Sequence, residues 1–354
     1  MNYHERMVQK VEELRKQKMV RILAIESSCD DTSVAVVENG RKVLSNVISS
    51  QIDIHTRFGG VVPEVASRNH ILAIMPLVDE VLKQANLTLK DIDCIGVTQG
   101  AGLVGALLVG LTSAKALAYA LDIPLIACNH IKGHIAGNYI TNLDLEPPFI
   151  CLIVSGGHTA IVKVKSYTHF ELIGSTQDDA IGEAFDKVAR VVGLGYPGGP
   201  KIDKISKGVE PKMEFVKHDT LANSFDVSYS GLKTAVINYI HNAKERGEPL
   251  DIPQICASFQ HQAVCMMVEK TIRACLRSGL KTIAIAGGVS ANTYLRETLK
   301  REAGKVGITV KMPEFIYCTD NAAMIGSIAY YNLLEFPPAE LSISALANID
   351  LSND

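Results

Sequence analysis

Two histidines four residues apart are the first residues of this sequence whose spacing suggests chemistry. The segment His130-Ile131-Lys-Gly-His134 would place both imidazoles on one face of a helix, within reach of a single ion. Neutral imidazole suits zinc or iron. A peptidase of the H-E-x-x-H type needs a glutamate after the first histidine, and this chain has Ile131 there. The pattern favours metal binding over that peptidase mechanism, with two surface histidines as the structural alternative.

Asp320 is the candidate for a third metal ligand. It opens the segment Asp-Asn-Ala-Ala, where it would also serve as a helix N-cap. Asp186 and Asp203 stand beside loops, where a carboxylate can accept hydrogen bonds from ribose hydroxyls. Asn292 follows two glycines and would bridge a sugar or a base, or else cap a helix. His158 would touch phosphate, or else only shape a turn.

The elements that must position these residues occur twice. Residues 22–37 and 149–164 each read as a strand, a tight polar turn and a second strand. Residues 95–102 and 283–292 each read as a strand that runs through glycines into a helix. Glycine turns of this kind let backbone N–H groups approach an anion, and a following helix adds its positive end. Four such loops in paired order predict a duplicated α/β protein that binds phosphate.

A chain of 354 residues is too long for one ordinary hydrophobic core, so we expect two lobes. The first lobe spans 21–128, and a C-terminal helix at 321–340 packs back on it. The second spans 129–320 and includes a helical insertion at about 177–280. Residues 1–20 are an N-terminal extension with the pattern of a short surface helix.

The composition excludes several classes of protein. With 47% apolar and 21% charged residues, the chain is globular, and its eight scattered cysteines form no C-x-x-C pair, which fits reduced thiols in a cytoplasmic protein. The longest apolar stretch, 101–111, is interrupted by glycines and too short to span a membrane. A net charge of −3 argues against unaided binding to nucleic acid, so an RNA partner would need a local or shared basic surface.

Seven motifs in order along the chain resemble those of the TsaD family. They are Glu26-Ser-Ser-Cys-Asp-Asp-Thr, His130-Ile-Lys-Gly-His134, Ser155-Gly-Gly-His-Thr159, Gly182-Glu-Ala-Phe-Asp-Lys, Tyr196-Pro-Gly-Gly-Pro200, Gly287-Gly-Val-Ser-Ala-Asn292 and Cys318-Thr-Asp-Asn321. The match runs from about Arg21 to the final helix. The resemblance implies a duplicated two-lobed fold of the actin, Hsp70 and sugar-kinase (ASKHA) type. It also implies transfer of the threonylcarbamoyl group from L-threonylcarbamoyl-AMP to N6 of the adenosine 3′ to the anticodon (position 37), in tRNAs that read ANN codons.

The resemblance further implies roles for individual residues. By position, the family's metal ligands correspond to His130, His134 and Asp320, which would hold one divalent ion per subunit, Fe2+ or Zn2+. Its substrate contacts correspond to Ile153, Val154, Ser155, Gly156, Gly157, Asp186, Gly199, Asp203 and Asn292. Asp31 stands where many members carry glutamate, and residues 1–20 inherit nothing. Bacterial relatives work with a TsaB paralogue and a TsaE ATPase, which would account for the weak basic character.

Together these roles predict that distant loops meet at one cavity between the lobes. There, the metal and the Ser155 turn would bind the donor's phosphate. The exocyclic amine of adenine is a poor nucleophile, so positioning must supply much of the barrier reduction. Asp31 and His158 are the candidates for the residue that accepts the amine proton. A small-molecule kinase of the same fold and a nucleotide-gated assembly module are the alternative functions.

Overall fold

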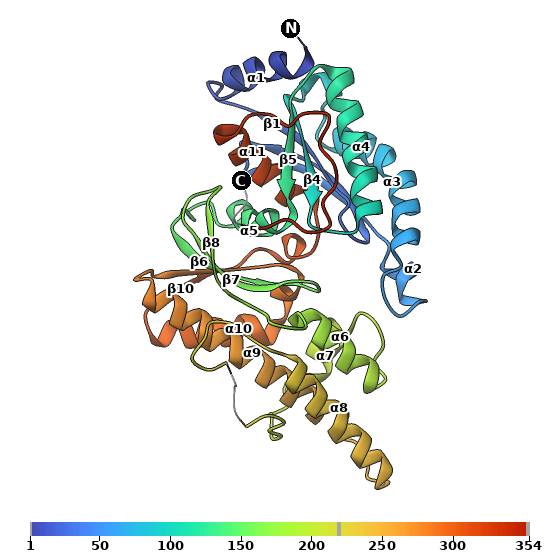
Figure 1. The fold of residues 1–354 in the computed structure, drawn as a ribbon, viewed down its shortest axis with the longest axis vertical. Coiled ribbons are helices and arrows are strands. Elements are labelled where there is room, and N and C mark those ends of the chain that lie inside the picture. Colours follow the sequence, from blue (N-terminus) through green and yellow to red (C-terminus); the bar gives the residue numbers. More distant parts are fainter. Residues whose placement is uncertain (1, 218–220, 352–354) are drawn as a thin grey trace. The chain divides into compact units, whose positions relative to one another are not determined.

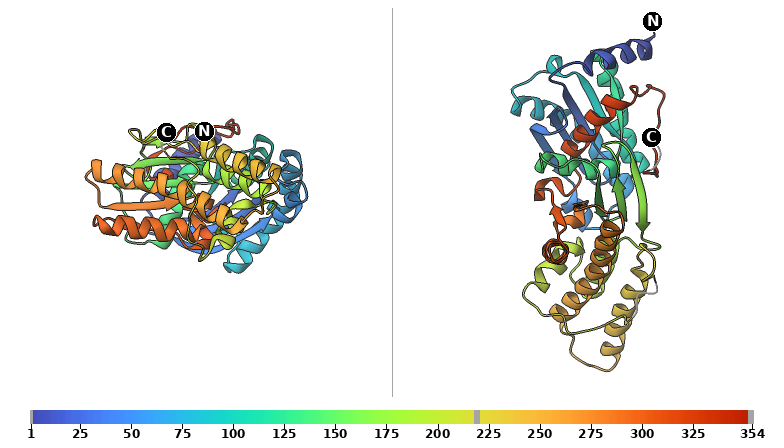
Figure 2. Two further views of the ribbon diagram at one scale, coloured as in Figure 1. Left: turned by 90° about the horizontal axis from the view of Figure 1, so that it is seen from below. Right: turned by 90° about the vertical axis from the view of Figure 1, so that its left-hand side faces the viewer.

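The computed structural model describes residues 2–217 and 221–351, which form two compact units (Figure 1, Figure 2). Unit 1 comprises Met1–Glu146, Ser166–His169 and Pro313–Asp354. Unit 2 comprises Pro147–Lys165 and Phe170–Met312. Each unit has its own sheet and its own core.

Unit 1 is built on a five-stranded mixed sheet in the order β3-β2-β1-β4-β5. The central strand β1 runs antiparallel to β2 and parallel to β4. Apolar and β-branched residues dominate β1, β2, β4 and β5 and favour extended structure that is buried on both faces, whereas the edge strand β3 is only partly buried. The strands are β1 (Arg21–Glu26), β2 (Asp31–Glu38), β3 (Lys42–Ser50), β4 (Cys94–Gly100) and β5 (Leu125–Asn129).

Helices cover both faces of this sheet. Leu23 and Ile25 belong to the core that α3 and α4 share with the sheet. On the other face, α11 lies against the strands, as the right view of Figure 2 shows. Gly326 lets the helix pack closely, because a Cβ at this position would lie only 2.6 Å from a methyl group of Val37. The helices are α1 (Tyr3–Leu14), α2 (Ile52–Thr56), α3 (Pro63–Gln84), α4 (Val104–Leu121), α5 (His130–Thr141) and α11 (Ala322–Glu335), with short 3₁₀ helices η1 (Leu89–Asp91) and η3 (Phe315–Tyr317).

Unit 2 repeats the same sheet. Its strand order is β10-β9-β6-β7-β8. Read in reverse, as β8-β7-β6-β9-β10, this order corresponds strand by strand to β3-β2-β1-β4-β5 of unit 1. Like β1, β6 runs antiparallel to the next strand of the chain and parallel to the strand on its other side. The strands are β6 (Phe149–Val154), β7 (Thr159–Val164), β8 (Phe170–Ser175), β9 (Thr282–Ala286) and β10 (Thr309–Lys311). The repeat predicted from the sequence is therefore present in the sheet topology.

Most of the helices of unit 2 lie between β8 and β9 in the sequence, where we expect the helical insertion. Their buried faces join the sheet in one large core that includes Phe185, Phe259 and Met267. The helices are α6 (Ile181–Val191), α7 (Gly198–Ser206), α8 (Ser230–Glu245), α9 (Ile252–Arg277) and, after β9, the 3₁₀ helix η2 (Gly288–Ala291) and α10 (Thr293–Lys305).

The division between the units differs from the boundary expected at residues 128 and 129. Helix α5 belongs to unit 1, because it packs against α11 and follows directly from β5. The segment 313–320 also belongs to unit 1. Helix α5 is buried on nearly all sides, so its sequence has no polar face that would indicate which sheet it joins.

The N-terminal helix α1 is a packed part of unit 1. Met7, Val11 and Leu14 are buried, and burial of such side chains stabilises the fold by about 1.5–3 kcal/mol each. This apolar contribution outweighs that of the surface ion pair between Arg6 and Asp122. Both partners of that pair are substantially exposed to solvent, which screens their attraction. The expected surface helix thus has one face in the core.

Helix α4 is long and apolar enough to cross a membrane, with a mean hydropathy of 1.6. Its residues Leu111, Ala114 and Ala118 are buried in the core of unit 1. A third of this helix is buried, and a core helix can pass the same test of length and composition, so one such helix is weak evidence for a membrane span.

Candidate metal centre and donor-binding loops

The two histidines of the H-x-x-x-H pattern lie on the first turns of α5. The side chain of Asn129 caps this helix by accepting hydrogen bonds from the N–H groups of Ile131 and Lys132, at 2.8 and 3.2 Å. The helix therefore begins at His130, and His134 follows one turn later on the same face. Their ring centroids are 4.6 Å apart, and both side chains are buried. The helical spacing thus brings both imidazoles to one point.

Asp320 completes a three-residue cluster in unit 1. Its Oδ1 lies 3.2 Å from Nε2 of His134 and 3.5 Å from Nε2 of His130. One ligand atom from each residue lies within 4.8 Å of the other two. The expectation that Asp320 caps the last helix is wrong, because the cap of α11 is Asn321, whose side chain accepts from the N–H of Met324 at 3.0 Å. Asp320 instead presents its carboxylate to both imidazoles.

A buried carboxylate, Glu26, lies behind His130. It ends β1, is 0% exposed, and its Oε2 lies 3.0 Å from His130 Nδ1. The same oxygen accepts from the hydroxyl of Thr98 at 2.6 Å, and Oε1 accepts from the N–H of Ser28 at 2.5 Å. Because a carboxylate only accepts, Nδ1 of His130 carries a proton and Nε2 faces Asp320. Glu26 thus fixes the orientation of the ring.

Glu26 belongs to one of the sequence motifs, but it is not among the predicted site residues. One signal was available, namely an acidic residue directly after the apolar run Ile22-Leu-Ala-Ile. A carboxylate that ends a strand buried on both faces needs a partner in the interior. The partner here is His130.

The charges of the cluster give its two histidines different protonation states. Burial alone would lower the pKa of His130, but the charges of Glu26 and Asp320 raise it to about 9. Burial lowers the pKa of His134, against the effect of its hydrogen bond with Asp320. Burial alone would raise the pKa of Glu26, but the positive charge of His130 holds it below its usual value. At neutral pH, one proton therefore sits where a cation would bind.

The donor set fits a divalent transition metal. Two imidazole Nε2 atoms and one carboxylate oxygen face the same point, and this combination is typical of zinc and of non-haem iron. The remaining nitrogen of His130 is held by a carboxylate, which is the usual outer partner of a metal-bound histidine. His130, His134 and Asp320 are therefore suited to hold such an ion.

In unit 2, the turn after β6 has the features of an anion site. Ser155 and His158 close it, because the N–H of Ser155 donates to the carbonyl of His158 at 2.8 Å and its hydroxyl accepts from the N–H of His158 at 3.0 Å. Gly156 and Gly157 between them are exposed. Backbone N–H groups of exposed glycines in a tight turn can donate to an anion.

Two glycines let neighbouring segments approach this turn. A Cβ at Gly182, in the first turn of α6, would lie 2.7 Å from the carbonyl oxygen of Ser155. Gly287, with a φ of +90°, follows β9, and a Cβ there would lie 2.5 Å from the carbonyl of Val154. The N-terminus of α6 and the turn after β9 therefore both meet the Ser155 turn, and Val154 itself is buried in β6, as is Ile153.

The predicted ribose contacts lie around the beginnings of α7 and α10. Asp186 Oδ1 accepts from the N–H of Gly198 at 2.6 Å, one residue before Gly199. Burial raises the pKa of Asp186, against these backbone hydrogen bonds. Asp203 Oδ2 accepts from the N–H and the hydroxyl of Thr293. Each carboxylate therefore holds a helix start and retains further lone pairs for a ligand.

Asn292 is tied to the protein at both ends of its amide. Its Oδ1 accepts from the N–H of Leu295 at 2.8 Å and caps α10, and its Nδ2 donates to Gln260 Oε1 at 2.8 Å. These two bonds fix which way the amide points and leave one N–H for a ligand. Gln260, buried on α9, is a second residue that the sequence motifs do not single out.

The two candidates for proton acceptor have different environments. Asp31 begins β2 in unit 1, and burial raises its pKa to about 7, against a hydrogen bond from Ser50 and with an added contribution from the charge of Asp320. Its Oδ1 is buried without a hydrogen-bond partner. His158 is an exposed turn residue of unit 2. Only Asp31 thus lies near the metal-ligand cluster within one unit.

Comparisons with known proteins agree with these arrangements. Residues 42–327 match the family model described as TsaD, tRNA N6-adenosine threonylcarbamoyltransferase. Curated relatives with that name include one from Clostridium botulinum (strain 657 / Type Ba4), 57% identical over 95% of this chain and 99% of its own length. Another, from Clostridium perfringens (strain ATCC 13124), is 58% identical over 93% of this chain and 98% of its own length.

Solved structures support the fold. Full-length HypF in its phosphate- and nucleotide-bound form matches with a TM-score of 0.60 at 15% identity, over 89% of this chain and 47% of its own. Component A of the (R)-2-hydroxyglutaryl-CoA dehydratase of Acidaminococcus fermentans matches with a TM-score of 0.51 at 13% identity, over 89% of this chain and 100% of its own. The predicted duplicated, actin-like α/β fold is confirmed. The family match over most of the chain and the close relatives over nearly all of it place this chain in the TsaD family of tRNA N6-adenosine threonylcarbamoyltransferases.

Proposed function

We propose that this protein transfers the threonylcarbamoyl group of L-threonylcarbamoyl-AMP to N6 of adenosine 37, in tRNAs that read ANN codons, and so forms t6A. Membership of the family supports the reaction and the tRNA substrate. The observation that carries the proposal is the convergence of His130, His134 and Asp320 on one point of unit 1.

The three ligands would hold one divalent ion, Fe2+ or Zn2+. When bound there, the ion supplies positive charge that binds the donor's phosphate and stabilises the charge that develops as AMP leaves. The chain's own contribution is to fix the ligands. Glu26 orients His130, and the N-cap at Asn129 sets where α5 begins. Both bonds are made within the protein itself, so they preorganise the site.

Residues of unit 2 would bind the donor's AMP portion. The Ser155-Gly156-Gly157 turn after Ile153 and Val154 would donate backbone N–H groups to phosphate oxygens. Asp186, with Gly199 beside it, and Asp203 would accept hydrogen bonds from the ribose hydroxyls. Asn292 would donate its remaining amide N–H. Because each of these side chains is already held by a backbone or side-chain partner, little order is lost when the donor binds.

The chemical step forms a bond between N6 of adenosine and the carbamoyl carbon and breaks the bond from that carbon to the phosphate oxygen of AMP. The amine loses one proton, which a protein group or the departing phosphate must accept. Asp31 is the better candidate, since a carboxyl with a pKa of about 7 is matched to proton transfer near neutral pH. His158, exposed in the Ser155 turn, is the second.

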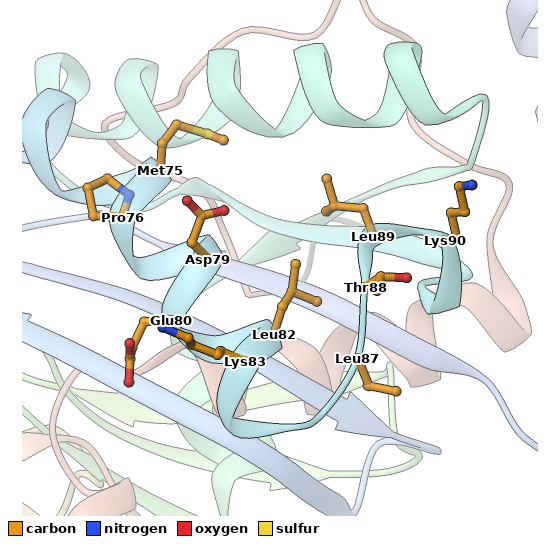
Figure 3. A pocket seen from close by; sticks show the side chains of 10 residues that line it. All are labelled: Met75, Pro76, Asp79, Glu80, Leu82, Lys83, Leu87, Thr88, Leu89 and Lys90. Carbon is orange, nitrogen blue, oxygen red and sulfur yellow. The ribbon is translucent and has the colours of Figure 1, made fainter.

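The partners would be a TsaB paralogue and a TsaE ATPase, in the cytoplasm. Unit 1 offers a surface for a subunit of related fold, because α3 exposes Ile71 and Leu72 and α4 exposes Val104 and Leu108. Figure 3 shows the adjoining groove of about 980 Å3, which lies between the second half of α3 and the segment 87–90 and includes the exposed side chain of Met75. Apolar side chains exposed on paired helices are typical of a protein interface.

The experiment is transfer to an unmodified tRNA transcript with purified L-threonylcarbamoyl-AMP and the partner subunits. His134→Ala should abolish t6A formation, read by mass spectrometry of nucleosides, while His241→Ala, an exposed histidine of α8, should not. Full turnover by the His134 variant would contradict the metal role. A kinase of this fold would instead consume ATP with a small substrate in the absence of tRNA. A peptidase of the H-E-x-x-H type would need a glutamate directly after His130, but this position is Ile131, a buried apolar residue of α5.

A further inference from the structure

The loop between α2 and α3 presents an aromatic side chain to solvent. Phe58 is 61% exposed, and its neighbour Arg57 is exposed as well. The residues that follow, Gly59 and Gly60, have open space where a Cβ would stand. A large exposed aromatic ring flanked by arginine and by glycines is free to take a flat partner on its face.

The loop is built rather than loosely attached. His55, at its base, is 0% exposed, and its Nδ1 accepts from the N–H of Val62 at 3.2 Å. The carbonyl of His55 accepts from the N–H groups of Phe58 and Gly60, at 3.0 and 3.3 Å. Buried Gln51 bonds through its amide to the carbonyl of Ala66 at 3.3 Å. Phe58 is therefore held outward by an ordered base, which lowers the entropy lost when it binds a partner.

The loop lies at the same edge of the sheet as the metal-ligand cluster. Ser50, the last residue of β3, pairs with Asp31, and the N–H of Gln51 donates to the carbonyl of Asp30 at 3.2 Å. On the α3 side of the loop, Nε2 of His70 lies 2.9 Å from the carbonyl of Cys29. Cys29 and Asp30 belong to the turn that follows Glu26, and Asp31 begins β2 directly after it, so the loop and the metal ligands share one end of unit 1.

Unit 1 has an excess of acidic residues, whereas the charged residue of this loop is an arginine. Of the 35 Lys and Arg residues of the chain, 14 lie in unit 1 and 21 in unit 2, whereas of the 38 Asp and Glu residues 22 lie in unit 1 and 16 in unit 2. Within 57–62, Arg57 is the charged residue. The nearest charges of α3, Glu64 and Arg68, pair with each other at 2.8 Å, and Asp53 lies in the first turn of α2. An RNA contact from this acidic unit must therefore depend on stacking more than on phosphate binding.

We propose that Phe58 stacks on an unpaired base of the tRNA anticodon loop, beside the adenosine that is modified, and that Arg57 contacts a phosphate of the same loop. The inference rests on the proposed function, since it takes tRNA as the substrate. Bases of a single-stranded loop can splay onto an aromatic side chain, and such stacking tolerates different bases. That tolerance suits an enzyme that modifies several tRNAs.

The test uses the full chain with its partner subunits and an unmodified tRNA transcript. Phe58→Ala should weaken tRNA binding about 5- to 150-fold, the effect typical of one lost base stack, and Phe58→Trp should retain it. The KM for tRNA should rise in parallel, with the KM for L-threonylcarbamoyl-AMP unchanged. The control is Tyr119→Ala, because Tyr119 is 64% exposed but lies near the end of α4, which leads back from the edge that carries the cluster.

Salt dependence separates stacking from charge. The Phe58→Ala variant should keep the wild-type slope of log Kd against log salt, whereas Arg57→Gln should reduce it by about one. Wild-type t6A formation checks the proposed function independently of these variants. If the wild type forms t6A while Phe58→Ala binds tRNA normally, the inference is wrong. It is equally wrong if Phe58→Ala instead weakens assembly with a partner subunit and leaves the tRNA affinity unchanged.

Discussion

Replacing Glu26 by Gln tests whether this carboxylate orients the metal ligand His130. Glu26 receives three donors, namely the N–H of Ser28, the hydroxyl of Thr98 and Nδ1–H of His130. A glutamine has one acceptor oxygen and one amide group of nearly the same shape. In one orientation, its NH2 faces the N–H of Ser28, and in the other it faces both Thr98 and His130. Either buried donors face each other, or His130 must give up the Nδ1 proton that keeps Nε2 available to a metal.

The cost has two parts. One unsatisfied buried donor destabilises the fold by about 1–3 kcal/mol, and Glu26 at 0% exposure has no solvent to relieve it. Loss of an outer partner of a metal-bound histidine lowers metal affinity by about 10- to 100-fold, which equals about 1.4–2.7 kcal/mol. We therefore expect Glu26→Gln to show both a lower free energy of unfolding without metal and a weaker Kd for Zn2+.

The measurements are urea unfolding of the metal-free protein and Zn2+ binding in competition with a chromophoric chelator. The matched control is Glu38→Gln, because Glu38 is a mostly buried carboxylate at the other end of β2, in ion pairs with Arg21 and Lys42. It should leave the Kd for Zn2+ unchanged. A Glu26→Gln variant with wild-type Zn2+ affinity would refute the orienting role, whatever its stability.

Three further predictions concern pH and close packing. Because the pKa of His130 is raised to about 9, its protonation stabilises the metal-free protein below about pH 6.5, and this contribution is lost as pH rises through about 9. Zn2+ must displace the same proton, so its affinity should rise over that window by up to about tenfold per pH unit and level off above it, as competition with a chelator would test. The raised pKa of Asp31 also makes stability fall as pH rises, here between about 4 and about 7, because the buried carboxylate destabilises the fold once it ionises. Asp31→Asn should therefore unfold at higher urea than the wild type at pH 8, with no difference below about pH 4, and should transfer at least about 100-fold more slowly if Asp31 accepts the proton. Gly182→Ala, whose Cβ would lie 2.7 Å from the carbonyl of Ser155, should raise the KM for the donor while leaving Zn2+ affinity intact, and an unchanged KM would show that the Ser155 turn does not bind it.

The sequence predicts those features that depend on local patterns. The strand–turn–strand repeats at 22–37 and 149–164 are local, and both form as expected, as does the helix that carries His130 and His134. The choice between Asp320 and Asn321 as helix cap is not local, because both residue types are good N-caps and the helix can begin after either. Asp320 reaches the two histidines instead, and that contact depends on packing between α5 and the start of α11.

Longer-range partnerships explain the remaining differences. Glu26 and His130 are 104 residues apart, and their contact needs β1 and β5 to lie on either side of β4. Gln260 meets Asn292 only because α9 passes beside the start of α10. Strand order of this kind follows from how two sheet edges and several helices pack, which periodicity within one segment does not encode.

The duplication also explains why one half of the protein is suited to a cation and the other to an anion. In both units, the central strand and its antiparallel neighbour are joined by four residues, 27–30 and 155–158. In unit 1, the turn follows Glu26 and contains an aspartate, whereas in unit 2 it is Ser-Gly-Gly-His. The carboxylate of Glu26 supports a metal ligand by holding His130, whereas glycine N–H groups favour phosphate. The net charges of the units agree with this difference, because unit 1 has an excess of acidic residues and unit 2 an excess of basic residues. The two equivalent turns thus serve different ends: the one in unit 1 leads away from Glu26, which orients His130, and the one in unit 2 presents glycine N–H groups.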